Sequence, residues 1–162
     1  MEYIKEKILN ILREDARIDP AEIAGMLTVS ESEIRDIIQQ LEDDKIILRY
    51  TTVMNREKMT DSVVALIEVK VTPQKGSGFA AIAKKIYQFD QVESCFLISG
   101  DYDFMVILRG ETMRKVADFV HEKLAVIDGV NSTATHFVLK EYKDSGVIFE
   151  EDTRDDRLVV TP

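Results

Sequence analysis

The sequence predicts an α+β protein of two parts, in which three short helices precede a unit of four strands and two helices. In the first 45 residues, apolar side chains recur every three or four positions, which is the period of a helix. From Ser62 onward, β-prone and helical runs follow one another in the order strand, helix, strand, strand, helix, strand. These two patterns place a helical domain before an α/β domain.

Three helices are expected in the first part of the chain. The second is expected over Pro20–Leu27, because Asp19 can cap it and proline is tolerated at the first helical position. The third is expected over Glu31–Asp43, where Ser30 and Glu33 form a capping box. The first helix carries a single apolar stripe, formed by Ile4, Ile8, Ile11 and Leu12.

The second and third helices are separated by a short turn, which predicts a helix-turn-helix. In such a pair the second helix enters the major groove of DNA. Arg35 can read guanine with its forked side chain, and Gln39 can read adenine. Ser30 and Ser32 can contact phosphate near the positive end of the helix.

A β-prone run, Ile47–Met54, follows the third helix. Within this run, Tyr50–Val53 together with Arg49 predict a wing, or a strand that passes to the second domain. Arg49 is therefore included among the residues expected to contact DNA. The first part of the chain is predicted to be a (winged) helix-turn-helix.

The second part predicts a ferredoxin-like βαββαβ sandwich. Strands are expected at about Ser62–Val71, Val92–Ser99, Tyr102–Arg109 and Val130–Tyr142, and helices at about Gly78–Phe89 and Thr112–Ala125. The first and third strands carry apolar residues on both faces, so both faces of the sheet need a cover. The helices can cover one face, and the sheet of a partner is the economical cover for the other.

The predicted domain boundaries follow from these patterns. The helix-turn-helix domain is expected over residues 1–55 and a polar linker over residues 56–61. The α/β domain is expected over residues 62–143, followed by an acidic C-terminal tail over residues 144–162.

The charge of the chain opposes DNA binding. The net charge is −9, and residues 1–55 hold seven Lys and Arg against twelve Asp and Glu. Attraction to phosphate needs a basic face, so a plain three-helix packing unit with no DNA role stays open as an alternative. A local basic face is still available from Arg13, Arg17, Arg35, Lys45 and Arg49.

Other classes of protein lack their signatures here. No apolar run has the roughly 18 residues of a membrane span, and no signal peptide is visible, so a cytoplasmic location without membrane contact is expected. The single cysteine, Cys95, excludes an intrachain disulfide and suits a buried strand position. His121 and His136 lack the spacing of metal ligands. No catalytic, metal or cofactor site is predicted.

Several short segments occur in a fixed order along the chain. The N-terminal ones are Ile8-Leu9-Asn10-Ile11-Leu12-Arg13-Glu14-Asp15-Ala16-Arg17, Glu22-Ile23-Ala24, Val29-Ser30 and Leu41-Glu42-Asp43-Asp44-Lys45-Ile46-Ile47. The later ones are Ser99-Gly100-Asp101-Tyr102-Asp103 and Val130-Asn131-Ser132-Thr133-Ala134-Thr135-His136-Phe137-Val138-Leu139-Lys140. Their order and spacing resemble the Lrp/AsnC (feast/famine) family of transcriptional regulators over roughly residues 1–143.

The resemblance implies a sequence-specific regulator whose partners are DNA and a small effector, an amino acid or a related molecule. It implies that the α/β domain binds the effector and forms a homodimer, which in the family often assembles further, commonly to an octamer. It also places an effector pocket at a subunit interface, lined by Gly100, Asp101, Tyr102, Asp103, Thr133 and Thr135.

The residue types in this loop and strand suit an amino-acid ligand. Gly100 lets a ligand approach the backbone, and Asp101 and Asp103 can accept hydrogen bonds from an α-ammonium group. Thr133 and Thr135 alternate onto one strand face and offer hydroxyls. The alternative is a tight hairpin turn whose aspartates cap local amides.

Two other functions stay open. The family usually carries more basic residues than Glu31-Ser32-Glu33-Ile34-Arg35-Asp36 on its recognition helix, which favours an amino-acid sensor or assembly protein without strong DNA binding. Haem-pathway decarboxylases share a similar two-domain architecture. An enzyme of that kind would have to use His121 or His136, and the sequence offers no second catalytic group.

Overall fold

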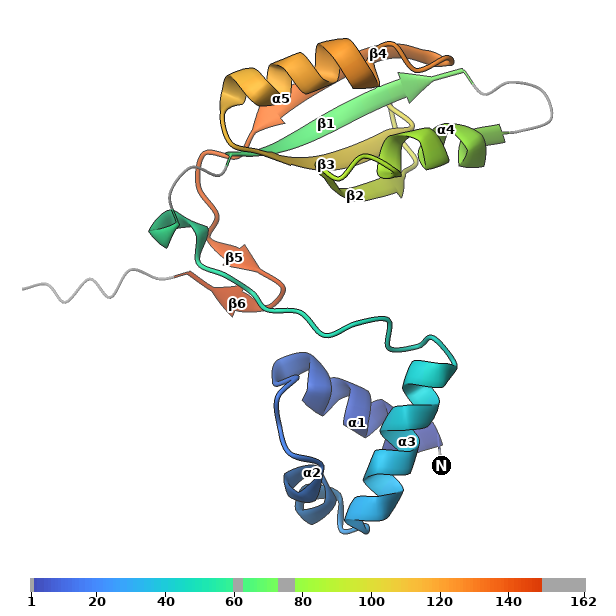
Figure 1. Cartoon of the computed structure of the whole chain (residues 1–162), viewed down its shortest axis with the longest axis vertical. Coiled ribbons are helices and arrows are strands. Elements are labelled where there is room, and N and C mark those ends of the chain that lie inside the picture. Colours follow the sequence, from blue (N-terminus) through green and yellow to red (C-terminus); the bar gives the residue numbers. More distant parts are fainter. Residues whose placement is uncertain (1, 60–62, 73–77, 150–162) are drawn as a thin grey trace, which may run out of the picture. The chain divides into compact units, whose positions relative to one another are not determined.

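The structure is a computed structural model that describes residues 2–59, 63–72 and 78–149 (Figure 1). The chain divides into two compact units, Met1–Val53 (the helical unit) and Met54–Pro162 (the sheet unit). The predicted first residue of the first strand, Ser62, lies outside the described residues, as do the last two residues of the predicted linker and most of the predicted acidic tail.

The helical unit contains the three helices that the sequence predicts, α1 (Glu2–Glu14), α2 (Pro20–Leu27) and α3 (Glu31–Asp43). The Asp19 carboxylate accepts a hydrogen bond from the N–H of Ala21, and the Ser30 hydroxyl accepts one from the N–H of Glu33. Both α2 and α3 therefore begin where their capping residues predict. The helices share one core, whose buried members are Ile8, Ile23, Ala24, Ile34, Ile37 and Leu41.

A tight turn joins α2 to α3. Thr28 ends α2 in the left-handed region, at φ 58° and ψ 42°, and its N–H donates to the carbonyl of Ala24. The N–H of Val29 donates to the same carbonyl at 3.2 Å. Because a β-branched residue adopts this conformation at a cost, the two hydrogen bonds are needed to hold the turn that sets the direction of α3.

The chain between α3 and Asn55 forms no strand in the described residues 2–59, so Tyr50–Val53 does not form the wing or strand that its composition predicts. The N–H groups of Ile46 and Ile47 instead donate to the carbonyl of Leu41 and turn the chain away from the end of α3. A strand needs a neighbour to satisfy its backbone groups, and the helical unit consists of helices that offer none.

The sheet unit has the predicted βαββαβ order. Its elements are β1 (Val63–Val71), α4 (Gly78–Tyr87), β2 (Val92–Leu97), β3 (Phe104–Gly110), α5 (Met113–Phe119) and β4 (Val130–Phe137). The strands form one antiparallel sheet in the order β2-β3-β1-β4, with α4 and α5 beside it (Figure 1). This connectivity and strand order are those of a ferredoxin-like sandwich, as the sequence predicts.

Side chains alternate between the two faces of β1. Ala65, Ile67 and Val69 are fully buried in a core that they share with side chains of α4 and α5. Leu66 and Glu68 belong to the opposite face, where they pair with Ile107 and Met105 of β3. This second face is called the open sheet face, and it consists of Leu66, Glu68, Phe96, Met105, Ile107 and His136.

β2 and α4 end two residues before their predicted ends, at Leu97 and Tyr87, and two further elements end earlier still. β4 stops at Phe137 and not near Tyr142, because the chain beyond it is bound elsewhere: Glu141 accepts from Arg56, and the carbonyl of Tyr142 accepts from the N–H of Phe149. The helix predicted over Thr112–Ala125 is α-helical only to Phe119. A π-helical turn, η2 (Val120–Leu124), follows and brings Leu124 fully into the core.

Short elements occupy the regions that the sequence predicts as linker and tail. Arg56–Lys58 forms a 3-10 turn, η1, and the strands β5 (Lys143–Asp144) and β6 (Val147–Ile148) form a hairpin. The hairpin turn uses Ser145 and Gly146, which both have positive φ, at 49° and 90°. Two positive φ values in a row are typical of the tight turns whose twist matches that of paired strands.

Gly129 fixes where β4 starts. Its φ is +97°, and a Cβ there would lie 2.9 Å from Cδ1 of Ile82 and 3.2 Å from the carbonyl oxygen of Thr72. The Gly129 carbonyl accepts a hydrogen bond of 2.8 Å from the N–H of Thr72. This close contact joins the end of β1 to the beginning of β4, so it sets the register of the strand that carries Thr133 and Thr135.

Candidate DNA-binding helix and effector site

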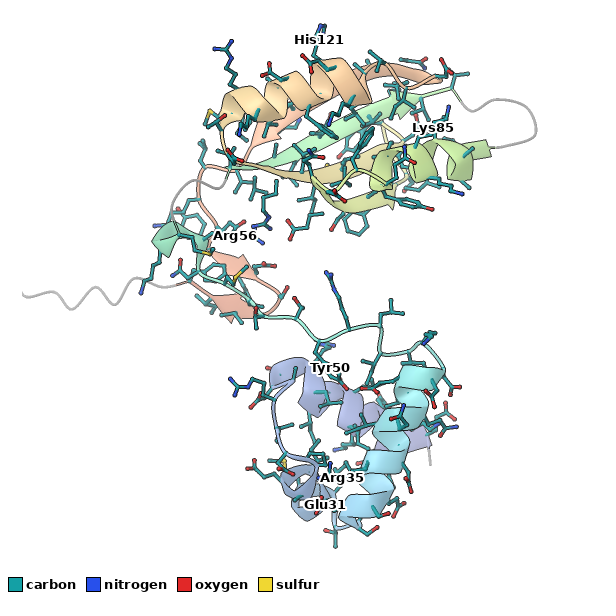
Figure 2. All side chains as sticks on the ribbon, viewed as in Figure 1. Glu31, Arg35, Tyr50, Arg56, Lys85 and His121 are labelled. Carbon is teal, nitrogen blue, oxygen red and sulfur yellow. The ribbon has the colours of Figure 1, made fainter. Side chains whose placement is uncertain are left out.

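The outer face of α3 carries three of the residues predicted to contact DNA. Ser32, Arg35 and Gln39 are exposed, whereas Ile34 and Leu41 are buried in the helical core. The spacing of three and four residues places the exposed side chains on one side of the helix. α3 therefore presents a polar face with Arg35 near its beginning (Figure 2).

Both predicted base readers are bound to a carboxylate one helical turn away. The Nε and Nη2 atoms of Arg35 donate to Oε1 of Glu31 at 2.8 and 2.5 Å. Nε2 of Gln39 donates to Oδ1 of Asp43 at 3.1 Å. The sequence prediction did not include these partners, although their spacing of four residues on a helix is the signal that identifies them.

The other two predicted DNA contacts differ in their surroundings. The Ser30 hydroxyl accepts the capping hydrogen bond from the N–H of Glu33 at 3.2 Å, which leaves its own O–H as a donor for a phosphate. Arg49 is exposed but lies in the irregular segment after α3, and not on the helix itself.

Tyr50 ties this irregular segment to α3. Its hydroxyl donates to Oε1 of Glu42 at 2.8 Å. Partial burial, the hydrogen bond to Glu42 and the negative charge of Glu42 together raise the pKa of Tyr50 to about 12, because all three disfavour the phenolate. The Tyr50 hydroxyl therefore holds this segment against α3, although the segment forms no strand.

The loop predicted to bind the effector joins β2 to β3. The N–H of Asp103 donates to the carbonyl of Val69 at 3.1 Å, and its carboxylate oxygen Oδ2 accepts from the N–H of Val71 at 2.8 Å. Val71 is the point where the register between β1 and β4 shifts. At least one oxygen of Asp103 thus accepts from an amide of the neighbouring strand β1, 32 residues away in the sequence, and not from an amide of its own turn.

The remaining loop residues are more accessible. Asp101 is exposed, Tyr102 is half-buried, and a Cβ added at Gly100 would meet no heavy atom within 4 Å. The backbone at Gly100 is therefore open to an approaching group. The carboxylate of Asp101 has the exposure that an ammonium ligand needs.

The sheet brings Thr133 to the same end as this loop. Thr133 pairs with Val69, the residue whose carbonyl holds Asp103, while Thr135 pairs with Ile67 one step further along. Both threonines are half-buried and share the face of Val69 and Ile67, which is the face covered by α4 and α5. The structure thus places Asp103 and Thr133 on either side of Val69 and leaves Thr135 farther away.

A small cavity lies at the opposite end of the sheet. It has a volume of about 120 Å³, and Arg56, Val64 and Glu141 are among the residues that line it. Arg56 binds Glu141 through Nη1 at 2.7 Å and Glu93 through Nη2 at 3.4 Å, and Arg109 also pairs with Glu93. No sequence pattern predicts this ion-pair cluster, because its members come from four distant segments.

The two histidines that the enzyme alternative would use lie on different elements, His121 on η2 and His136 on β4. His121 and His136 are both exposed, and His136 contacts Glu68 at 3.2 Å on the open sheet face. Cys95 is half-buried in β2, and burial raises the pKa of its thiol, which disfavours the reactive thiolate. Within residues 2–59, 63–72 and 78–149, no three His, Cys, Asp or Glu side chains are grouped to hold a metal ion.

No helix in the described part of the chain is long and apolar enough to cross a membrane.

Comparison with known families decides between the open interpretations. The family model for the Lrp/AsnC ligand binding domain matches residues 64–148, and the model for a winged helix-turn-helix DNA-binding domain matches residues 1–47. The chain belongs to the Lrp/AsnC family.

Related proteins match this Lrp/AsnC protein over nearly its whole length. It is 45% identical over 158 residues to the uncharacterized HTH-type transcriptional regulator YugG of Bacillus subtilis, covering 96% of this chain and 95% of that protein. It is 33% identical over 136 residues to the HTH-type transcriptional regulator LrpA of Pyrococcus abyssi, covering 84% and 94%. A solved structure, the transcriptional regulator NMB0573 of Neisseria meningitidis in complex with L-Met, superposes with a TM-score of 0.71 at 29% identity, covering 87% of this chain and 91% of that one.

These relatives are transcriptional regulators and not enzymes, which removes the decarboxylase-like alternative. The Lrp/AsnC protein described here is a DNA-binding transcriptional regulator with an N-terminal helix-turn-helix and an effector-binding α+β domain.

The Tyr50–Glu42 contact predicts an unusual alkaline titration. Below pH 10 the contact is intact, and as the pH rises from 10 toward 12 the unfolded chain ionises before the folded one, so stability falls over that interval. Absorbance at 295 nm should show a tyrosine component that titrates at about pH 12, and Tyr50→Phe should remove that component. Glu42→Gln should shift it toward 10. Loss of a component near 10 in the Tyr50→Phe variant would contradict the assignment.

Proposed function

We propose that this Lrp/AsnC regulator reads a specific DNA sequence through α3, and that an amino acid or related small effector, bound at the loop of residues 100–103, changes its DNA binding. The observation that carries the proposal is the single exposed face of α3, on which Ser32, Arg35 and Gln39 lie together beyond a hydrogen-bonded turn. The relatives come from bacteria and archaea, whose DNA lies in the cytoplasm, so a cytoplasmic location is part of the proposal.

Arg35 is the main sequence reader in this proposal. A guanidinium can donate two hydrogen bonds to the two acceptors that guanine shows in the major groove. Ser30 and Ser32 lie at the beginning of α3, where backbone N–H groups and the helix dipole favour phosphate. Arg49 adds a positive charge in the segment that follows the helix.

Binding of the purified protein to the DNA that flanks its own gene tests the proposal, in low and moderate salt and with a panel of amino acids. A specific complex that one amino acid strengthens or weakens supports both domains' roles. Absence of a complex even in low salt would favour the sensor or assembly protein without DNA binding, since Glu31, Glu33 and Asp36 lie on the reading helix.

Arg35→Ala should weaken binding to that specific sequence by roughly ten- to a hundredfold, because it removes a two-pronged contact to one base. Fluorescence anisotropy with the specific duplex and with a scrambled duplex measures the effect. The scrambled duplex should lose much less affinity. An unchanged affinity for the specific duplex would remove Arg35 from the interface.

The effector proposal is supported by the loop chemistry and by the relative that was solved with L-Met. Asp101 is exposed and can accept from an α-ammonium group, and the open backbone beside Gly100 can approach a ligand closely. Asp103 and Thr133 lie nearby across Val69, and Tyr102 offers a half-buried ring. Thr135 completes the proposed set at a greater distance from the loop.

Asp101→Ala should weaken binding of the responsive amino acid about tenfold, because it removes a charge-assisted hydrogen bond, and should leave DNA binding without ligand unchanged. Asp118→Ala on α5 is the matched control, since it also removes an exposed carboxylate from the same unit. Isothermal titration calorimetry measures both. Equal ligand affinities for the two variants would exclude Asp101 from the site.

We also propose that the protein forms a homodimer, which can assemble further to an octamer as the family commonly does. The open sheet face supports the dimer. Phe96 is 50% exposed there, and Leu66, Met105 and Ile107 lie beside it without a helix over them. A sheet face of this kind is economically covered by the same face of a second copy. An effector pocket at a subunit interface would then respond directly to assembly.

Phe96→Glu should raise the dissociation constant of the dimer at least about tenfold, because each copy would then bury a charge in an apolar contact. The control is Met113→Glu, which changes a residue of similar exposure, 54%, at the start of α5. Light scattering across a dilution series gives the masses. If Phe96→Glu and the control dissociate over the same range of concentrations, the dimer interface lies elsewhere.

A further inference from the structure

We propose that Glu31 is a specificity-determining residue of the DNA-reading helix, because it positions the guanidinium of Arg35 for one guanine and cancels its attraction to phosphate at other sequences. The inference rests on the proposed function that α3 reads DNA. It concerns how the helix distinguishes one sequence from another.

The hydrogen bonds between the two side chains define which edge of the guanidinium is occupied. Nε and Nη2 of Arg35 both donate to Oε1 of Glu31, at 2.8 and 2.5 Å. These atoms form one edge of the planar group. The edge formed by Nη1 and the second proton of Nη2 is not engaged by this contact, and it is the edge that can donate side by side to the O6 and N7 atoms of guanine.

The position of the pair on the helix agrees with a reading role. Glu31 and Arg35 are separated by one helical turn, and their side chains are 46% and 57% exposed (Figure 2). An ion pair as exposed as this one contributes little to folding stability. When the major groove displaces water from it, the same pair becomes stronger, so its orienting effect is largest in the bound complex.

Cancelling the charge of Arg35 also matters for discrimination. A free arginine on a long flexible side chain can contact a phosphate at any sequence, and such contacts supply most non-specific binding. An arginine held by Glu31 offers phosphate almost no net charge but keeps its two donors for a base. Residues 1–55 carry seven basic against twelve acidic side chains. Contacts to particular bases therefore have to supply the affinity that a general attraction to phosphate does not.

The chain supplies a matched control for this role. Glu33 lies in the same first turn of α3, is exposed, and carries the same charge as Glu31. Its backbone N–H donates to the Ser30 hydroxyl, and a glutamine at this position keeps that bond. Glu31→Gln and Glu33→Gln therefore change the charge of the helix equally, but only the first removes the carboxylate bound to Arg35.

The test uses the full-length protein and two short duplexes, one selected from a random pool by the wild-type protein and one scrambled sequence of the same composition. Fluorescence anisotropy at fixed salt gives the two dissociation constants. The discrimination ratio is the dissociation constant for the scrambled duplex divided by that for the selected duplex. Glu33→Gln should tighten binding to both duplexes by a similar factor and leave the ratio unchanged. Glu31→Gln should tighten binding to the scrambled duplex and lower the ratio about tenfold, which is the discrimination expected of one two-pronged base contact.

Two further measurements tie the effect to Arg35. One guanine of the selected duplex should be identified because its replacement no longer weakens binding by the Arg35→Ala protein. Replacement of the same guanine should weaken binding by Glu31→Gln less than binding by the wild-type protein. In an Arg35→Ala background, Glu31→Gln should leave the ratio unchanged, because the residue that it positions is absent. Circular dichroism before binding establishes that each variant keeps its helices.

Equal ratios for Glu31→Gln and Glu33→Gln would overturn the inference while leaving the proposed function in place. A change in ratio that persists without Arg35 would also overturn it. If the wild-type protein selects no sequence from the pool, the proposed function itself fails and the inference fails with it.

Discussion

The alternation of side chains along β1 is the constraint on which the sheet unit depends. β1 lies between β3 and β4, and its residues Ala65, Ile67 and Val69 are fully buried beneath the two helices. The same alternation puts Leu66 on the open sheet face. One strand therefore fixes the helix-covered core, the face proposed for dimerisation and, through Val69 and Val71, the position of the loop at residues 100–103.

The sequence predicts the elements of the fold well because each has its own periodicity and its own capping residue. Asp19 and Ser30 identify the beginnings of α2 and α3, and alternating apolar residues identify β1 and β3. The prediction is poorer where an element depends on a neighbour. The β-prone segment Tyr50–Val53 stays irregular because the helical unit offers it no strand, and β4 is shorter than its composition suggests because Glu141 and Tyr142 are bound by Arg56 and Phe149.

The residues of the candidate sites also differ in how far the sequence alone predicts them. Arg35 and Asp101 can be chosen from the sequence, because a helix face and a loop between strands expose them whatever the rest of the fold does. The partners of these groups are harder to foresee. Glu31 follows from helix spacing, but the carboxylate of Asp103 meets the N–H of Val71 only once β1 and β3 are paired, and no local pattern contains that contact.

The ion pairs of Arg56 set a mechanical limit on the regulator. Arg56 is held to the sheet unit by Glu141 and Glu93, and Tyr50 is held to α3 by Glu42, so only the five residues 51–55 lie between the two anchored points. A chain of that length spans at most about 20 Å when fully extended. In the proposed dimer, the two copies of α3 can therefore reach only half-sites whose separation lies below a limit set by this segment. A longer segment would let the dimer bind half-sites that lie farther apart, and it would leave both domains unchanged.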